Sequence, residues 1–474
     1  MKFTTDIVIG LEIHAELDTQ TKLFCSCATK GNQQPNTRCC PICLGHPGTR
    51  PVLNKKALDY ATKLCLALGS KLTKEIVFSR KNYFYPDMSK NYQITQFEEP
   101  IGTGGTITLK TGRKIQLTRI HIEEDPAALA YTHGMKNSDS VLVDYNRAGN
   151  PLVEIVTEPQ LTSPAEARDF LNRLISVLGY LNIFDITRGI IKADANISLK
   201  ESNYSRVEIK NISGFKEIEK ALTYEITRQK TQLRRGLKIT RETRGWNPTS
   251  KTTLSLRTKE TEADYGYILE PDLSLITLTD ELIHLMKKEI PELAQQKSER
   301  YQREHKLSKE DADVMSMELE LAQLFEKVAT KIDPKLAARW LRRELLRVLN
   351  YNKKTTKEIQ FNEKEIIELL SLVQTNTISE TTAQKLMEQL MEKPFSPKEH
   401  IKKHNLEQVT NEKEIETLCK ETIKEHPQAV KDYHAGEQKS LHYLLGQIMK
   451  KTRGKAEPTK TTKILKKELK KKEL

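Results

Sequence analysis

The 474-residue chain has no run of apolar residues that approaches the roughly eighteen needed for a membrane-spanning helix. The N-terminus also lacks the apolar core of a signal peptide, because an alternating strand pattern begins within a few residues of Met1. Hydrophobic residues nevertheless make up 37% of the chain, which is enough to build the cores of two to four domains. We therefore expect a cytoplasmic protein.

A phosphate-binding loop is missing as well. Gly102-Thr-Gly-Gly is followed by neither Gly-Lys-Ser/Thr nor a helical pattern, so we interpret this stretch as a turn. Any use of ATP must therefore depend on a metal ion and carboxylates.

Cysteines are few, but five of the seven lie within nineteen residues. Cys25-x-Cys27 and Cys40-x-x-Cys43 have zinc-knuckle spacing, in which four thiolates close a tetrahedral site. Because four thiolates leave no open position for a substrate, the predicted zinc is structural. Reduced core cysteines are the alternative interpretation, and Cys39 is an alternative to Cys40 as a ligand.

The sequence predicts an α+β region followed by helices. Short alternating strands dominate up to about residue 290, with helical periods at 54–68, 163–178 and 215–235. After Pro291 the strand patterns vanish and amphipathic helical periods take over. We predict three domains, at residues 1–292, 293–405 and 406–474.

Positive charge is concentrated at the C-terminus. The formal net charge is +13, and residues 449–474 hold eleven Lys or Arg against three Glu. Such clustering indicates a polyanionic partner, first of all nucleic acid, although a solvated tail that only aids solubility is the alternative.

Carboxylates lie on the polar faces of several predicted strands. In the strand Ile7–Leu17, alternation places Glu12, His14 and Glu16 opposite a continuous apolar face. Asp194 with Asn196, and Glu208, occupy equivalent positions in two later strands, and the Glu123-Glu124-Asp125 run ends another. The strand period places His121, Glu123 and Asp125 together, opposite Glu124. If these faces converge, they form a Mg²⁺ site able to hold a nucleotide phosphate; scattered surface charges are the alternative.

Longer ordered motifs make the chain similar to a known family. The sequence resembles the GatB proteins, the B subunits of aspartyl/glutamyl-tRNA amidotransferases, over its whole length. The resemblance is carried by Gly10-Leu-Glu-Ile-His14, Cys40-Pro-Ile-Cys-Leu-Gly-His-Pro-Gly48, Arg80-Lys-Asn-Tyr-Phe-Tyr-Pro-Asp87, His121-Ile-Glu-Glu-Asp125, Asn146-Arg-Ala-Gly-Asn-Pro-Leu-Val-Glu-Ile-Val156, Asp194-Ala-Asn-Ile-Ser198, Glu208-Ile-Lys-Asn211 and Glu270-Pro-Asp-Leu273.

This resemblance implies a reaction and a set of partners. ATP would phosphorylate the side-chain carboxylate of Asp or Glu misattached to tRNA, and ammonia would then displace phosphate to give Asn-tRNA(Asn) or Gln-tRNA(Gln). The chain has neither a Cys–His glutaminase pair nor a Gly-Gly-Ser-Ser amidase motif. The resemblance therefore implies a heterotrimer. In it the amidase (A) subunit supplies ammonia, and a small C subunit attaches the amidase to the B subunit.

The resemblance also assigns residues. It implies a cradle-like catalytic domain whose Mg²⁺ ligands and catalytic residues are Glu12, His14, Glu124, Asp194 and Glu208. For Glu124 the family pattern overrules the strand period. We expect Lys81, Tyr83, Glu154 and Asn196 to contact bound ATP, and the tail from residue 406 to contact tRNA. Glu16 falls outside this ligand set, and we interpret it as an ordinary polar neighbour.

A second reading is a non-catalytic, zinc-stabilised scaffold that presents charged tRNA to a partner. Four polar residues distinguish the catalytic hypothesis from the scaffold hypothesis. A scaffold does not require Glu12, His14, Asp194 and Glu208 on the polar faces of strands.

Overall fold

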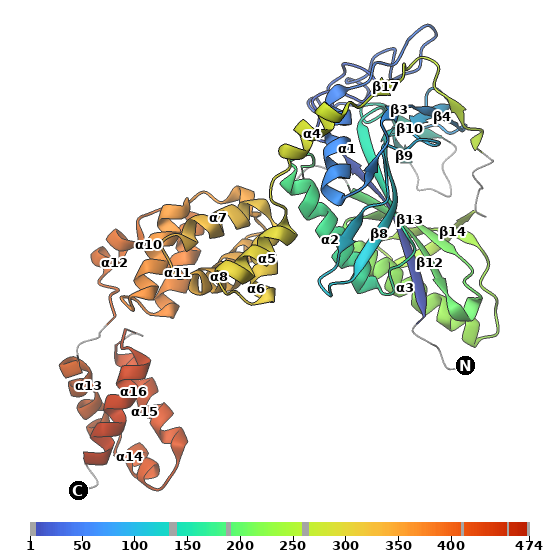
Figure 1. The fold of residues 1–474 in the computed structure, drawn as a ribbon. Helices are drawn as coiled ribbons and strands as arrows, with labels where there is room; N and C mark the ends of the chain where they lie inside the picture. The colour runs from blue at the N-terminus through green and yellow to red at the C-terminus, as the bar shows by residue number, and fades with distance from the viewer. Residues whose placement is uncertain are drawn as a thin grey trace. The chain divides into compact units, whose positions relative to one another are not determined.

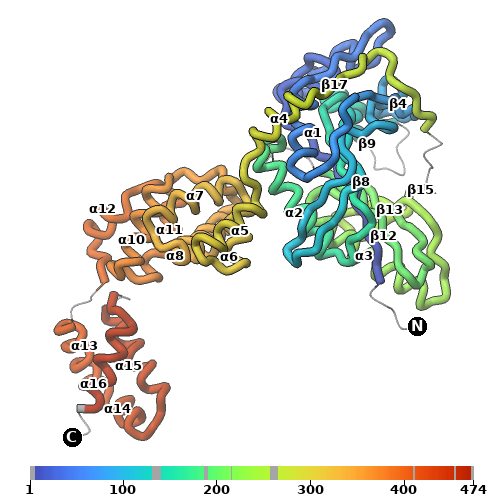
Figure 2. The backbone as a smooth tube through the Cα atoms, viewed as in Figure 1, coloured from blue at the N-terminus to red at the C-terminus, as the bar shows by residue number. Residues whose placement is uncertain are grey.

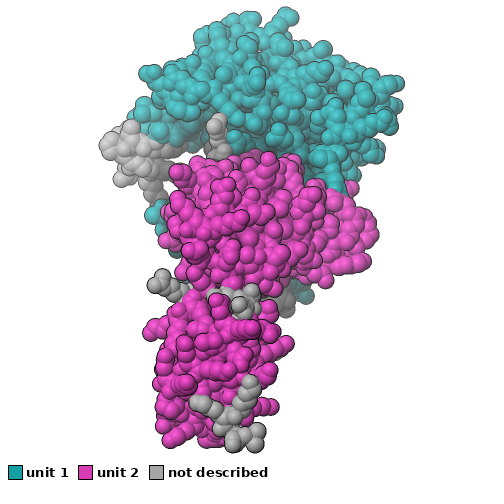
Figure 3. All heavy atoms as spheres, turned by 90° about the vertical axis from the view of Figure 1, so that its left-hand side faces the viewer, with its two compact units in different colours: residues 1–293 teal, residues 294–474 magenta. Residues whose placement is uncertain are grey.

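A computed structural model describes residues 6–131, 140–185, 191–257, 265–408, 412–452 and 455–471. The chain divides into two compact units, residues 1–293 and 294–474, which Figure 3 shows in different colours. Unit 1 contains the strands together with α1 to α4, and unit 2 is helical, which confirms the predicted α+β class followed by helices. None of the described helices is both long and apolar enough to cross a membrane.

Unit 1 is built on a ten-stranded sheet with β1 near its centre (Figure 1). The strand order is β15-β14-β13-β12-β1-β11-β8-β6-β2, and β7 pairs with β8. Its strands are β1 (Ile7–Glu16), β2 (Lys71–Leu72), β6 (Gly102–Thr103), β7 (Thr106–Thr108), β8 (Lys114–Glu124), β11 (Pro151–Thr157), β12 (Ile191–Leu199), β13 (Val207–Ser213), β14 (Glu242–Asn247) and β15 (Thr252–Arg257). All neighbours are antiparallel except β13 and β14, which are parallel.

Three smaller sheets complete the strands of unit 1. One joins β4 to β5 and β16, a second joins β9 to β10, and a third joins β3 to β17. Their bounds are β3 (Glu75–Ile76), β4 (Ser79–Asn82), β5 (Tyr92–Thr95), β9 (Ala128–Tyr131), β10 (Val141–Asp144), β16 (Ile268–Leu269) and β17 (Ile276–Thr277).

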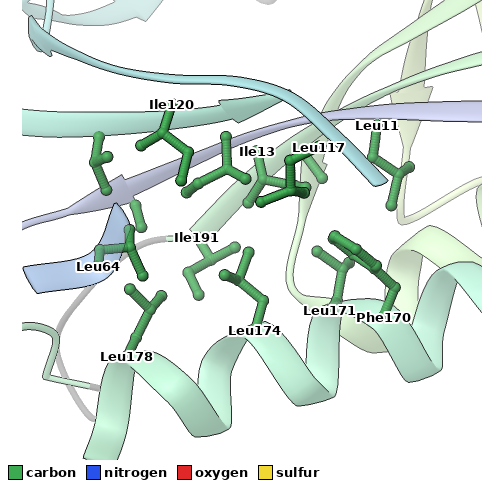
Figure 4. Packing of buried hydrophobic residues seen from close by; sticks show 14 of the residues in the cluster. Leu11, Ile13, Leu64, Leu117, Ile120, Phe170, Leu171, Leu174, Leu178 and Ile191 are labelled. Carbon is green, nitrogen blue, oxygen red and sulfur yellow. The ribbon is translucent and has the colours of Figure 1, made fainter. Parts of the chain in front are cut away.

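Helices cover the apolar face of the main sheet. They are α1 (Lys55–Leu68), α2 (Pro164–Tyr180) and α3 (Phe215–Arg234), and they confirm the three predicted helical periods; α4 (Asp280–Lys288) packs on α1. Leu171, Leu174 and Leu178 of α2 point towards Ile13 of β1 and Ile120 of β8 (Figure 4). Since successive strand residues alternate faces, this burial leaves the even-numbered residues of β1 on the opposite face.

Local sequence fixes where these helices begin. The Asn54 side chain accepts hydrogen bonds from the backbone N–H groups of Lys56 and Ala57 at the start of α1, and Gly69 ends the helix with a φ of +71°. Ser163 caps α2, and Pro164 occupies its first turn, where no intrahelical N–H donor is required.

Unit 2, whose backbone is coloured yellow to red in Figure 2, has two separate clusters of buried hydrophobic residues. The first cluster is formed by α5 (Ala294–Glu304), α6 (Lys309–Met317), α7 (Leu319–Ala329), α8 (Pro334–Trp340), the π-helical turn η3 (Leu341–Leu345), α9 (Leu346–Tyr351), α10 (Glu363–Gln374), α11 (Glu380–Glu392) and α12 (Pro397–His404). The second is formed by α13 (Glu412–Glu425), α14 (Pro427–His434), α15 (Gln438–Lys451) and α16 (Pro458–Lys471).

The helical period that begins at Ser308 is interrupted. Apolar residues recur at helical spacing from Val314 through Met317 and Leu321 to Phe325, yet Glu318 is extended and separates α6 from α7. The break allows α6 to pack against α7, so that Met315 and Phe325 are buried in the same cluster.

Candidate active site

The strand register places acidic residues from distant parts of the sequence on one face of the sheet. Glu12 of β1 is directly opposite Asp194 of β12, and Asn196 is opposite Glu208 of β13. On the other side of β1, His14 is opposite Glu154 of β11, which is in turn opposite His121 of β8. Because directly opposed residues in antiparallel strands project to the same side, these residues form one continuous polar surface.

Glu12, Asp194 and Glu208 form the first acidic group. Each contributes a carboxylate oxygen, and these oxygens lie within 4.8 Å of one another. Asn196 donates a hydrogen bond from Nδ2 to Glu12 Oε1 at 2.8 Å, and Lys210 Nζ lies 2.7 Å from Asp194 Oδ2. Burial, reinforced by the nearby Glu154 carboxylate, raises the pKa of Glu12. The group therefore holds more negative charge than Lys210 alone compensates.

The structure offers an observation that favours a hard cation at this group. The buried Oδ1 atom of Asn196 has no hydrogen-bond partner within the described part of the chain. The nitrogen of the same amide contacts Glu12, and Asn196 is directly opposite Glu208, so this residue adds an uncharged oxygen to the acidic group. Mg²⁺ prefers oxygen ligands and commonly binds through a few carboxylates, and this donor set fits it.

A second group lies beside the first and contains His14, Glu123 and Glu154. His14 Nε2 is 3.4 Å from an oxygen of each glutamate, and His121 Nε2 is 3.0 Å from Glu154 Oε2. Burial by itself lowers the pKa of both histidines, but Glu154 and Glu123 outweigh it; the pKa of His121 is about 9, and that of His14 is well above its usual value.

Glu124 lies in neither group. Its carboxylate accepts a hydrogen bond from the backbone N–H of Ile94 at 2.8 Å and pairs with Lys90. Alternation along β8 explains this position, because Ile120 and Ile122 share its side of the strand whereas His121 and Glu123 face His14. The strand period predicted the shared face of His121 and Glu123, whereas the choice of Glu124 as a ligand came from the family resemblance.

The four residues predicted to contact ATP fall into two sets. Glu154 and Asn196 belong to the polar surface described above. Lys81 and Tyr83 lie at β4, where Lys81 Nζ is 4.6 Å from the ring centroid of Tyr265 and the rings of Tyr83 and Tyr265 meet edge to face. Burial raises the pKa of the Tyr83 hydroxyl, with Asp87 and Glu123 adding to the effect.

The thiols of Cys25, Cys27, Cys40 and Cys43 converge, with all four sulfur atoms within 4.8 Å of one another. Cys40 and Cys43 sulfurs are 4.0 Å apart, and the Cys40 backbone N–H donates to Cys43 Sγ at 3.1 Å. Hydrogen bonding from Cys25 lowers the pKa of Cys43 to about 5 against the opposing effect of burial. This donor set fits a tetrahedral zinc ion.

Two neighbouring residues define the thiol cluster further. Cys39 lies outside it, and its sulfur contacts the backbone oxygen of Asn36 at 3.2 Å. The fully buried Lys22 places Nζ 3.7 Å from Cys43 Sγ, where a positive charge offsets thiolate charge.

Comparisons with known proteins agree with this architecture. The profile described as the GatB/GatE catalytic domain matches residues 7–284, and the profile described as the GatB domain matches residues 323–469. The chain therefore belongs to the GatB family.

Curated relatives are similar over nearly the whole chain, and they define the type of subunit. The aspartyl/glutamyl-tRNA(Asn/Gln) amidotransferase B subunit of Thermoanaerobacter pseudethanolicus is 41% identical over 98% of this chain and 99% of the relative. The corresponding B subunits of Haloquadratum walsbyi and Methanospirillum hungatei are 42% and 43% identical, each over 98% of this chain and at least 97% of the relative.

Proposed function

We propose that the polar surface of unit 1 catalyses the ATP-dependent activation of the side-chain carboxylate of Asp-tRNA(Asn), Glu-tRNA(Gln) or both. Ammonia supplied by a partner protein then converts the activated group to an amide. The observation that carries the proposal is the placement of Glu12, Asp194 and Glu208 in one group immediately beside His14 and Glu154. The relatives' names, which describe B subunits of amidotransferases for these tRNAs, agree with it.

The chemistry balances in two steps. A substrate carboxylate oxygen attacks the γ-phosphorus of ATP, the bond to the β-phosphate oxygen breaks, and ADP leaves. Ammonia then attacks the acyl carbon, a C–N bond forms, and the C–O bond to phosphate breaks as ammonia loses a proton. Mg²⁺ would offset the repulsion between the anionic reactants.

The chain's own residues position these reactants. We assign Glu12, Asp194 and Glu208 as ligands of Mg²⁺. His14, Glu123 and Glu154 form the neighbouring part of the site. Lys210, whose pKa is raised by Asp194 and Glu208 against the opposing effect of burial, keeps its positive charge and can contact a phosphate. Asn196 orients Glu12 through its amide nitrogen.

Substitution of the carboxylates distinguishes the catalytic proposal from the hypothesis of a non-catalytic scaffold. We expect Asp194→Asn or Glu12→Gln to lower ATP-dependent activation in the assembled complex by about 100-fold or more, because a charge-stabilising group is lost from the site. Binding of misacylated tRNA should be retained. The exposed Glu75 provides a matched control, and Glu75→Gln should leave both properties unchanged. Undiminished transamidation in Asp194→Asn would favour the scaffold.

We also propose that the C-terminal helices contact tRNA and that an amidase and a small third protein, the A and C subunits of a heterotrimer, complete the enzyme. The basic residues of α16 and its surroundings support an RNA contact. Leu406 packs against the first helical cluster, and the Gln408 backbone N–H bonds Thr377 O at 2.7 Å, so a truncation that removes residues 409–474 preserves these contacts.

This truncation tests the tail directly. It should weaken tRNA affinity by about 10-fold or more, since several phosphate contacts are lost, and the salt dependence of binding should become shallower. ATP hydrolysis driven by a small carboxylate mimic should change little. An unchanged tRNA affinity would contradict the assignment.

A further inference from the structure

The polar surface continues beyond His14 towards one end of the strands. Glu16 follows His14 by two residues on β1, and Asp125 follows Glu123 by two residues at the end of β8. The Leu17 backbone N–H bonds Pro151 O, and the Asp125 backbone N–H bonds Asn150 O, so the strand register extends to these positions. Glu16, Asn150 and Asp125 therefore lie on the same face as His14 and Glu123.

Asn150 has an acceptor atom left over. Its side chain is 4% exposed, and Nδ2 donates to Glu16 Oε1 at 2.7 Å. Because a carboxylate accepts hydrogen bonds, the amide must turn its nitrogen towards Glu16 and its oxygen away. That oxygen, Oδ1, is buried and has no hydrogen-bond partner in the described residues. An unpaired buried acceptor costs free energy, so a donor is expected there when the protein works.

Asp125 presents a second such acceptor. It is also 4% exposed, and its Oδ1 has no hydrogen-bond partner in the described ranges. Arg147 Nε approaches the other oxygen, Oδ2, at 3.3 Å, whereas Lys192 Nζ is 3.8 Å from Oδ1, beyond hydrogen-bond distance. The Lys192 side chain is 35% exposed and can turn towards solvent.

A cavity of about 740 Å³ gives a ligand access to this part of the surface. Glu16 and Asn150 line it together with Arg147. Three cations line the cavity, and all have protein partners: Arg147 donates to the carbonyls of residues 126 and 127, Arg38 donates to those of residues 28, 29 and 32, and Lys30 pairs with Asp18. The cations of the cavity are therefore engaged, while two buried, unpaired acceptors belong to Asn150 in its lining and to Asp125 beside Arg147.

Unpaired hydrogen-bond acceptors favour a ligand that carries hydrogen-bond donors. An ammonium group carries three N–H donors and no acceptor, and its charge complements Glu16 and Asp125. Residues two apart on a strand are about 6.6 Å apart, so this place lies one such step from His14. In an aspartyl or glutamyl ester, three or four bonds, about 4–5 Å, separate the side-chain carboxylate carbon from the α-nitrogen.

We propose that Glu16, Asp125 and Asn150 form a subsite for the α-ammonium group of the aminoacyl ester. The subsite holds the amino end of the aminoacyl group while its side-chain carboxylate reaches towards the neighbouring group of His14, Glu123 and Glu154. This inference rests on the proposed function. Free ammonium ion has the same donors and is the other source of this chemistry; the separation between the reactive carboxylate and the α-nitrogen favours the ester.

The test compares two substrates in the complete complex with its partner proteins. One is tRNA carrying aspartate or glutamate, and the other is the same tRNA carrying the α-hydroxy isostere, which lacks the ammonium charge. ADP release is measured with no ammonia donor present, so that only activation is followed. We expect kcat/KM of the natural complex to fall about 10- to 100-fold with the hydroxy substrate.

Substitution of Glu16 should lower kcat/KM for activation only with the aminoacyl substrate, which carries the ammonium group. Glu16→Gln should lose a similar factor with the aminoacyl substrate and less than about 3-fold with the hydroxy substrate, a non-additivity that shows direct contact. Glu16→Asp, which keeps the charge, should recover part of the loss. Asp18→Asn changes a carboxylate of the same cavity that pairs with Lys30, and it should keep the preference of the unmodified complex for the aminoacyl substrate.

Three results are decisive. Equal losses on both substrates in Glu16→Gln would assign Glu16 a structural role and overturn the proposal. If Glu16→Gln instead raised the KM for ammonium chloride in the amidation step and left activation unchanged, the subsite would bind ammonium ion. That result would overturn its assignment to the aminoacyl ester. A natural complex that releases no ADP with either aminoacyl-tRNA would instead refute the proposed function itself.

Discussion

Lys210 donates a hydrogen bond from Nζ to Asp194 Oδ2 at 2.7 Å, and the same nitrogen lies 3.3 Å from Glu208 Oε1. A protein ammonium group thus stands among the carboxylates that we assign to Mg²⁺. In the absence of a metal ion, Lys210 reduces the repulsion between these carboxylates.

Removal of this charge should make stability depend more strongly on Mg²⁺. In Lys210→Met the three carboxylates repel one another without compensation, so the Tm in chelator should fall by a few degrees. Added Mg²⁺ should then raise the Tm by more than it does in the unmodified protein, because a cation bound only by the folded state stabilises that state. Thermal unfolding across a Mg²⁺ titration measures both effects, and an identical Mg²⁺ response in the two proteins would contradict the assignment.

Adjacent glutamates on β8 should behave differently. Glu123→Gln removes a carboxylate that faces His14, and we expect the Mg²⁺ concentration for half-maximal activation to rise about 10-fold or more. Glu124→Gln leaves Lys90 without its carboxylate partner in a buried position, so it should chiefly lower the free energy of unfolding. Activation assays and denaturant unfolding on the same pair of variants distinguish these outcomes, and the reverse pattern would support Glu124 as one of the metal ligands, as the family resemblance implies.

The cysteine cluster provides a paired test. Cys40→Ser should lose bound zinc and much of the associated folding stability, because the site loses one of its four ligands. Cys39→Ser should keep both, since Cys39 lies outside the cluster. Zinc content by elemental analysis, together with thermal unfolding with and without chelator, measures the difference. Retention of a full equivalent of zinc by Cys40→Ser would show that the assigned ligand set is wrong.

His121 gives stability a defined pH dependence. Its pKa in the folded protein is about 9, held up by Glu154 and Glu123 against burial, whereas an unfolded histidine titrates near about 6.5. Because its folded pKa is raised, protonated His121 stabilises the folded state fully below about pH 6.5. This stabilisation, on the order of 3 kcal/mol, is lost as the pH rises through about 9.

The measurement is the free energy of unfolding in chelator between pH 6 and 10. We expect it to decline over this range, and His121→Gln should make the decline shallower, with the remainder carried by His14, whose pKa is also raised. A slope in His121→Gln as steep as in the unmodified protein would mean that His121 does not contribute to the pH dependence.

The sequence by itself determined which residues share a face of each strand. Glu12 with His14, Asp194 with Asn196, and His121 with Glu123 follow from alternation, a consequence of covalent backbone geometry that needs no tertiary contact. The helix starts at Asn54 and Ser163 were also predictable from local sequence, because these side chains accept hydrogen bonds from nearby backbone N–H groups.

Only the tertiary structure decided which faces meet. β1 lies between β11 and β12, so residues about 140 to 180 positions apart in sequence share one surface, and packing of the apolar face on α1, α2 and α3 fixes that arrangement. The folded loops also place Cys40 rather than Cys39 in the thiol cluster. On β8 the structure follows the strand period and separates Glu123 from Glu124, because one side of the strand must pack against the core while the other faces His14.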